Sequence, residues 1–152
     1  MALPNIFTPE VTNEIIHRIN QLTPATKAQW GKMNVGQMLA HCNVTYEMMY
    51  ENNHPKPGAF MRWILKRFVK TVVVSETPYP KNNKTAPAFM IKGVRDFEKE
   101  KARLIAYLIR TKDLGEKHFD NAVSHSFGNL SITEWNNMFY KHLNHHLAQF
   151  GV

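Results

Sequence analysis

Three histidines stand within five positions in the stretch "FYKHLNHHLAQF", residues 139–150. An α-helix advances about 100° per residue, so the side chains of His142 and His146 lie about 40° apart and Gln149 falls in the same column. His145 lies about 60° from His142 and outside that column. The large apolar residues of the same stretch lie on the same side of the helix as this column. We therefore expect the column to face the protein core.

Buried imidazoles need partners, because each carries one donor and one acceptor and an unpaired group costs about 1–3 kcal/mol. A divalent cation takes up the lone pairs directly, and the i, i+4 spacing places both nitrogens on one side of the ion. Such a pair alone is more often exposed or locally hydrogen-bonded. His41, in "MNVGQMLAHC", lies on the apolar stripe of an earlier helix, where a lone histidine is more often a satisfied core residue. Together, the three histidines predict one divalent metal site formed by His41, His142 and His146.

Three further side chains are candidates for the surroundings of the metal or for its pocket: His125, His145 and Gln149. His125 lies in the connection before the last helix, where it could either reach the edge of the metal site or fix the loop by bonding to the backbone. Cys42 lies about 100° round the helix from His41 and is not expected to be a ligand. As the only cysteine, it excludes a multi-thiolate site. Zinc, nickel and iron all suit imidazole ligands.

The elements that must position these residues are helices. The apolar periodicity, with Thr8, Asn34 and Ser131 before helix starts, predicts four long helices and one short one. Proline and asparagine predict a loop or lid over 75–90, and we expect an irregular connection over 111–130. This pattern predicts an all-α fold, a four-helix bundle with long connections and one extra short helix, in a single domain over 1–152. The helices are expected at about 8–21, 34–52, 59–69, 94–110 and 131–150.

The segments "MNVGQMLAHC" and "KHLNHHLAQF" resemble the two signature pieces of the DinB-like superfamily, which includes the YfiT-like proteins. In those four-helix bundles one histidine comes from the second helix and two come from a His-x3-His pair followed by Gln. The resemblance implies a DinB-like bundle with His41, His142 and His146 as ligands. The C-terminal segment from His125 to Val152 also resembles a bacterial branch of the superfamily without an assigned function.

The resemblance also implies chemistry, because relatives include metal-dependent transferases that use low-molecular-weight thiols. Three neutral imidazoles leave open metal positions, as expected of a catalytic site. We therefore expect a metal-dependent transferase of the small-thiol type, or a hydrolase, acting on a small molecule. The alternative is a non-catalytic bundle in which the metal supports folding or an oligomer interface. No His-Glu-x-x-His motif, Gly-x-Ser-x-Gly elbow or phosphate-binding glycine loop is present.

The chain carries a net charge of +7, but its basic residues are scattered among acidic ones. The densest run, "RWILKRFVK" at 62–70, could lie on a membrane, but a bundle helix with a solvated basic face is the expected alternative. Nucleic acid is not an expected partner, since no recognition motif is visible. No run of about 18 apolar residues and no signal-peptide pattern occurs, so we expect a cytoplasmic protein without a membrane partner. From the resemblance we also expect a homodimer.

Overall fold

The computed structural model describes residues 2–152. Over this range the protein is mostly helical with a small two-stranded sheet, so the predicted all-α class is confirmed. None of the described helices combines the length and apolar character needed to cross a membrane. The helices are α1 (Pro9–Gln21), α2 (Val35–Tyr50), α3 (Ala59–Ile64), α4 (Lys70–Val74), α5 (Phe97–Phe119) and α6 (Ile132–Gln149), with a π-helical turn at Leu65–Val69 and a 3-10 turn at Pro87–Phe89. The antiparallel strands are β1 (Val123–Ser124) and β2 (Gly128–Asn129).

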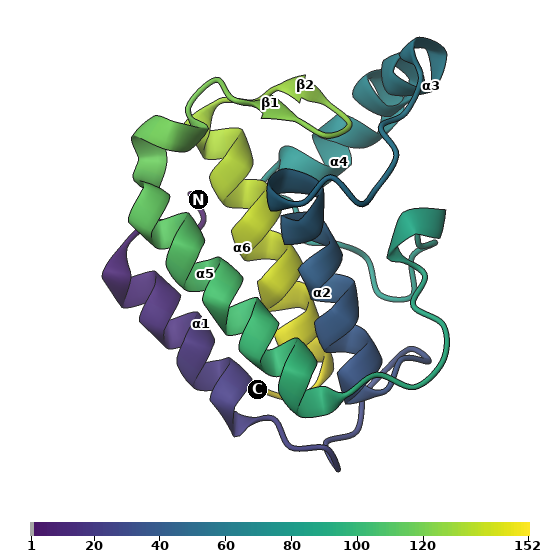
Figure 1. The fold of residues 1–152 in the computed structure, drawn as a ribbon, viewed down its shortest axis with the longest axis vertical. Coiled ribbons are helices and arrows are strands. Elements are labelled where there is room, and N and C mark those ends of the chain that lie inside the picture. The colour runs from purple at the N-terminus through teal and green to yellow at the C-terminus, as the bar shows by residue number, and fades with distance from the viewer. Residues whose placement is uncertain (1) are drawn as a thin grey trace.

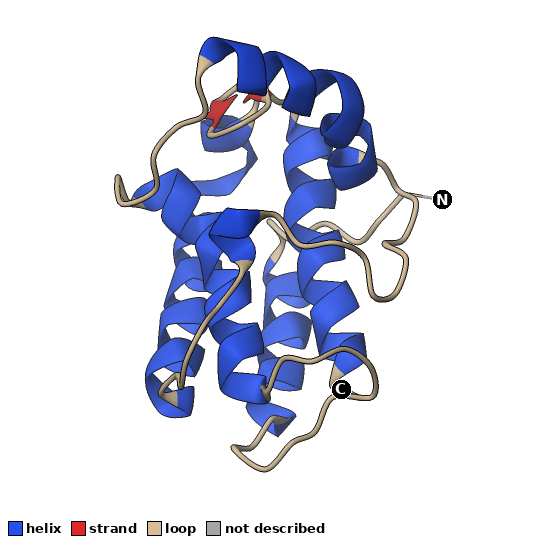
Figure 2. Cartoon of the chain, turned by 90° about the vertical axis from the view of Figure 1, so that its right-hand side faces the viewer, coloured by secondary structure: helices blue, strands red, loops and turns tan. Residues whose placement is uncertain are grey.

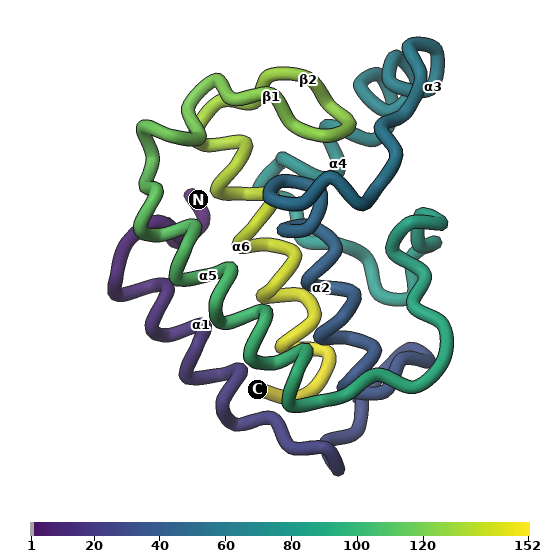
Figure 3. Tube along the Cα trace, in the orientation of Figure 1, coloured from purple at the N-terminus to yellow at the C-terminus, as the bar shows by residue number. Residues whose placement is uncertain are grey.

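The long helices α1, α2, α5 and α6 lie side by side around the core (Figures 1 and 3). Helices α1 and α6 run in one direction, and α2 and α5 run in the other (Figure 3). Because α2 and α5 are parallel, the chain from 51 to 96 must return along the molecule, and this stretch contains α3, α4 and the 3-10 turn. The core side chains between the helices include Ile15, Ile19, Met38, Leu39, Leu104, Leu108, Phe139 and Leu143.

Helix starts follow the predicted caps. The Thr8 side chain accepts a hydrogen bond from the first turn of α1. Asn34 and Gln37 form a reciprocal capping box at α2, and Ser131 and Glu134 form another at α6. Each box satisfies backbone N–H groups that the first helical turn leaves unpaired. These caps fix where α2 and α6 begin and therefore the phase of the histidines that they carry.

The predicted irregular connection over 111–130 is wrong in its first half. Helix α5 continues to Phe119 through a kink at Gly115, which has φ 70° and ψ 174°. Glycine adopts this conformation without the steric cost that a side chain would add. Phe119 is fully buried, so its packing stabilises the helical turn beyond the kink. Neither the extension of α5 beyond Arg110 nor the hairpin β1–β2 was predicted.

The segment 59–74 also differs from the expectation. It forms α3, the π-helical turn and α4 in succession, and it lies at one end of the molecule (Figures 1 and 2). None of the side chains of Ala59–Val69 is buried. The expectation of a bundle helix with a buried apolar face is therefore wrong for this stretch.

The C-terminal end of the same segment is attached to α6. Lys141, itself buried on α6, directs its ammonium group at the end of α4. A lysine ammonium has three donors, and each of them meets a carbonyl oxygen. The Nζ···O distances are 2.8 Å to Val72, 2.6 Å to Ser75 and 3.1 Å to Thr77.

Candidate metal centre

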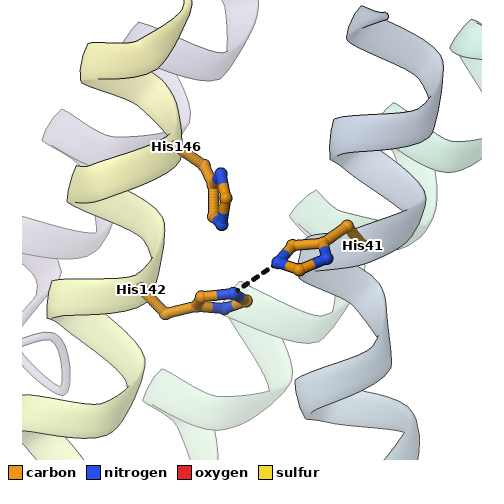
Figure 4. Close-up of side chains that lie close together, drawn as sticks. All are labelled: His41, His142 and His146. Carbon is orange, nitrogen blue, oxygen red and sulfur yellow. Dashed lines mark hydrogen bonds between the residues drawn. The ribbon is translucent and has the colours of Figure 1, made fainter. Parts of the chain in front are cut away.

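Helices α2 and α6 direct three imidazole rings at one another (Figure 4). His41 comes from α2, and His142 and His146 come from successive turns of α6. Each ring offers one nitrogen, and these three nitrogens all lie within 4.8 Å of one another. The ring centroids form a nearly equal triangle with sides of 4.5, 4.9 and 4.9 Å. The structure thus brings together the three residues predicted as ligands.

Outward hydrogen bonds fix the protonation of two rings. His41 Nδ1 lies 2.9 Å from the carbonyl oxygen of Phe89, which only accepts, so Nδ1 carries the proton. Gln149 Nε2 donates to the carbonyl of Trp30 at 2.7 Å. This bond orients the amide so that Gln149 Oε1 accepts from His146 Nδ1 at 2.8 Å. The Nε2 atoms of His41 and His146 are therefore unprotonated lone-pair donors.

The third ring can be protonated on either nitrogen. His142 Nδ1 lies 3.1 Å from the hydroxyl of Thr45, which can donate or accept. With the proton on Nε2, His142 donates to His41 Nε2 at 3.0 Å, but no donor among the described residues meets His146 Nε2. With the proton on Nδ1, three lone pairs converge. A divalent cation would accept all three lone pairs in that second arrangement.

Burial keeps the three rings neutral. Loss of hydration lowers the pKa of His41, lowers that of His142 well below its usual range, and lowers that of His146 to about 3. Repulsion between neighbouring charged rings is a smaller cause of the same pKa shifts in His142 and His146. Neutral imidazole is the form that binds a metal ion, so no ligand proton has to be displaced near neutral pH.

The loop before α2 holds Gln149 in place. Gly31 follows Trp30 and has φ +83°. A Cβ atom at Gly31 would lie 2.5 Å from Gln149 Nε2, a distance too short for a nonbonded contact. Glycine is required here both for its backbone conformation and for the close approach of this amide. Two successive hydrogen bonds, from Gln149 to the Trp30 carbonyl and from His146 to Gln149, therefore hold the His146 ring in position.

The predicted loop over 75–90 supplies one wall of the site. Its 3-10 turn places the Phe89 ring 5.4 Å from the ring of His41 and 5.9 Å from that of His142, centroid to centroid. The carbonyl of the same residue accepts from His41. No regular spacing connects Phe89 to the histidines, so sequence reasoning missed it together with the supporting roles of Thr45 and the Trp30 carbonyl.

His145 lies outside the triad, as its helical phase predicts. Its ring packs edge-on against Trp30, Tyr79 and His146, with centroid distances of 6.0, 5.7 and 5.0 Å. Cys42 is buried and points to Met38, where its Sγ donates to the thioether at 3.7 Å. Neither side chain belongs to the group of converging nitrogens.

The structure decides between the two roles left open for His125, and it does not place this residue at the edge of the metal site. His125 lies in the turn between β1 and β2, which packs at the end of the molecule where α6 begins (Figure 1). Its Nδ1 is 2.9 Å from the Ser126 hydroxyl, and its Nε2 is 3.3 Å from the carbonyl of His54. The alternative role, a histidine that fixes a loop through backbone bonding, describes it.

Comparison with known proteins gives a family but no activity. The profile of a family described as "Protein of unknown function (DUF1569)" matches residues 7–151, which include both histidine-bearing helices. No curated protein and no solved structure matches the chain.

Proposed function

We propose that this chain, which belongs to the DUF1569 family, binds one divalent transition metal through the Nε2 atoms of His41, His142 and His146. One observation carries the proposal: three neutral imidazole nitrogens lie within 4.8 Å of one another while each Nδ1 is bonded outward. Such outward bonds are typical of metal-bound histidines, since they set ring orientation and raise ligand basicity.

We also propose a fold family for this chain. The four long side-by-side helices, the paired signature segments and the triad together support a DinB-like four-helix bundle in a single domain over 1–152. The donor set is all nitrogen, which suits zinc, nickel or iron. A homodimer in the cytoplasm belongs to the same proposal through the superfamily resemblance.

The reaction that fits this site is transfer to or from a small thiol, or hydrolysis of a small molecule. When bound by three imidazoles, a divalent ion lowers the pKa of a water or thiol that takes an open position. Thr45, Phe89 and Gln149 keep the three rings oriented. The Phe89 ring also covers part of two imidazoles and limits the access of water to them.

Cobalt substitution tests the open position. Cobalt(II) reports its ligands by visible absorption, so we expect glutathione to add a sulfur-to-cobalt band to the spectrum of the loaded protein. S-methylglutathione, which lacks the thiol, is the matched control and should leave the spectrum unchanged. His145→Ala should give the same response as the wild type, because His145 lies outside the triad.

The non-catalytic alternative is favoured by one observation, the position of Phe89 against His41 and His142. If this wall closes the site, the metal supports the packing of α2 on α6 and takes no substrate. Cobalt loading without a spectral response to thiol, azide or any other anion assigns the site to this structural role. It would reject the thiol-transfer proposal while leaving metal binding intact.

A further inference from the structure

The exposed end of the molecule carries large apolar side chains. Phe60 is 75% exposed, Trp63 59% and Phe68 63%. Single exposed apolar residues are normal on a soluble domain, but a contiguous group marks an interaction site. Met61 and Val72 extend the group along the same segment. We name Phe60–Val72 the aromatic–basic segment.

The aromatic rings of this segment lie together. The ring centroids of Phe60 and Trp63 are 6.3 Å apart and nearly parallel, and those of Trp63 and Phe68 are 6.4 Å apart in edge contact. The π-helical turn over Leu65–Val69 lies between α3 and α4. Such turns are rare and occur frequently at functional sites. The three rings form one apolar surface at the end of the molecule that α3 occupies in Figure 1.

Positive charge surrounds these rings. Residues 59–74 contain four basic residues and no acidic one. Lys70 pairs with Glu134 at 2.7 Å. Among the ion pairs of residues 2–152, none involves Arg62, Lys66 or Arg67. Three cations therefore stand beside an exposed aromatic group without a carboxylate of the protein to neutralise them.

Contrary to the expectation from sequence that no membrane is a partner, we propose that the aromatic–basic segment docks on the surface of a bilayer that contains anionic lipid. Aromatic side chains partition to the membrane–water interface, and Lys and Arg beside them are attracted to anionic headgroups. The segment lies in the plane of the interface. This surface is separate from the metal centre, so the proposal does not depend on metal binding.

Charge favours a lipid surface over a second copy of the chain. A symmetric dimer through this surface would place Arg62, Lys66 and Arg67 of one copy opposite the same residues of the other. The chain already carries a net charge of +7, so such a contact would bring like charges together. An anionic surface instead satisfies the cations and the rings at the same time.

Vesicle sedimentation tests the proposal on the full-length chain. We expect binding to vesicles of equal parts phosphatidylcholine and phosphatidylglycerol, and little binding to phosphatidylcholine alone. Added salt should weaken binding, because it screens the headgroup charge. Trp63 should also report insertion through a blue shift of its emission. Trp63→Phe should remove this shift, since Trp135 is already buried and Trp30 packs against His145 and Lys81, away from the segment.

Two variants separate the apolar and the charged contributions. The triple variant F60S/W63S/F68S removes the rings, and R62E/R67E reverses two charges. We expect R62E/R67E to lose about fivefold or more in vesicle affinity for each cation lost. The matched control V94S/I109S changes two exposed apolar residues on other parts of the molecule, at 94% and 42% exposure, and should bind as the wild type does. Circular dichroism verifies that each variant is folded.

Three results would overturn the proposal. The first is equal binding to the two kinds of vesicle, or anionic binding unchanged in both test variants. The second is a dimer in solution that the triple variant disperses while vesicles are not bound, which assigns the surface to a second copy. The third is capture of an acidic peptide without vesicle binding. If the triple variant does not fold, the Trp63 emission shift in the wild type decides.

Discussion

The histidine triad and the aromatic–basic segment depart in opposite ways from the usual sorting of side chains. At the triad, polar rings are buried between α2 and α6, whereas in Phe60–Val72 large apolar side chains face solvent. Buried polar groups and exposed apolar patches are the two departures that most often indicate function. The two regions differ in whether their side chains have partners. Every imidazole has a hydrogen bond at Nδ1 to a neighbouring residue, but the exposed aromatic rings contact chiefly one another.

This contrast indicates that the two regions serve different kinds of partner. The triad is held rigidly by supports on three separate segments, as a site for a small ion requires. The aromatic–basic segment is held mainly at its C-terminal end, where Lys141 bonds to the backbone. Changes at the triad should therefore alter ligand binding, and changes in the segment should alter association while leaving the fold intact.

Removal of a ligand should have the largest effect. We expect His41→Ala, His142→Ala and His146→Ala each to weaken zinc or nickel binding by more than the roughly 10–100-fold typical of losing an outer hydrogen-bond partner. His145→Ala is the matched control from the same helix and should retain wild-type affinity. Competition with a chromogenic chelator measures the affinities. Equal losses in all four variants would contradict the assigned helical phase.

Disturbing the support of His146 should have the next largest effect. Gly31→Ala places a Cβ atom 2.5 Å from Gln149 Nε2 and strains a backbone with φ +83°, so it displaces the amide that orients His146. We expect metal affinity to fall roughly 10–100-fold. Gly58→Ala is the control, because a Cβ atom there meets no neighbour within 4 Å. Isothermal titration with zinc gives the comparison, and wild-type affinity in Gly31→Ala would show that the support does not matter.

The link between the two regions should affect folding more than binding. Lys141→Met removes the donor that three carbonyl oxygens share, while keeping a side chain of similar length. We expect the free energy of unfolding to fall by about 1–3 kcal/mol, partly offset because burial of the lysine charge is itself unfavourable. Burial already lowers the pKa of Lys141 to about 8. Urea denaturation of metal-free protein measures the change, and an unchanged midpoint would contradict the assigned role.

The smallest effect is expected at the exposed rings. F60S/W63S/F68S should change the free energy of unfolding by only about 0.5 kcal/mol or less for each substitution, because surface changes away from packed groups have little effect. Thermal denaturation followed by circular dichroism measures it. A loss of several kcal/mol would show that the rings pack against the body of the protein and would remove the contrast between the two regions.

Patterns among neighbouring residues were enough to predict where α1, α2 and α6 begin and that His41, His142 and His146 lie close together. The caps at Thr8, Asn34 and Ser131 depend on neighbouring residues alone, and the i, i+4 spacing of His142 and His146 depends on helical geometry alone. Long-range contacts were not predictable in this way. Phe89 reaches His41 across 48 positions, and only the tertiary fold shows it.

The same limit explains the errors. The run at 62–70 is amphipathic, and its pattern does not show whether the apolar side meets the core or lies beyond it. The structure places it at the end of the molecule, where no core is available to cover Phe60 or Trp63. The sequence could not decide between the two roles of His125, because proximity to α6 in the chain did not show that β1 and β2 lie at the start of that helix.

Metal content tests the central claim most directly. The chain, purified without an affinity tag and dialysed against metal-free buffer, should carry about one divalent transition metal per 17.6 kDa by elemental analysis. His142→Ala prepared in parallel should carry none, and added zinc or nickel should raise the melting temperature of the wild type alone, because a ligand that binds only the folded state stabilises it. Wild-type protein that holds no transition metal and shows no such rise would contradict the account.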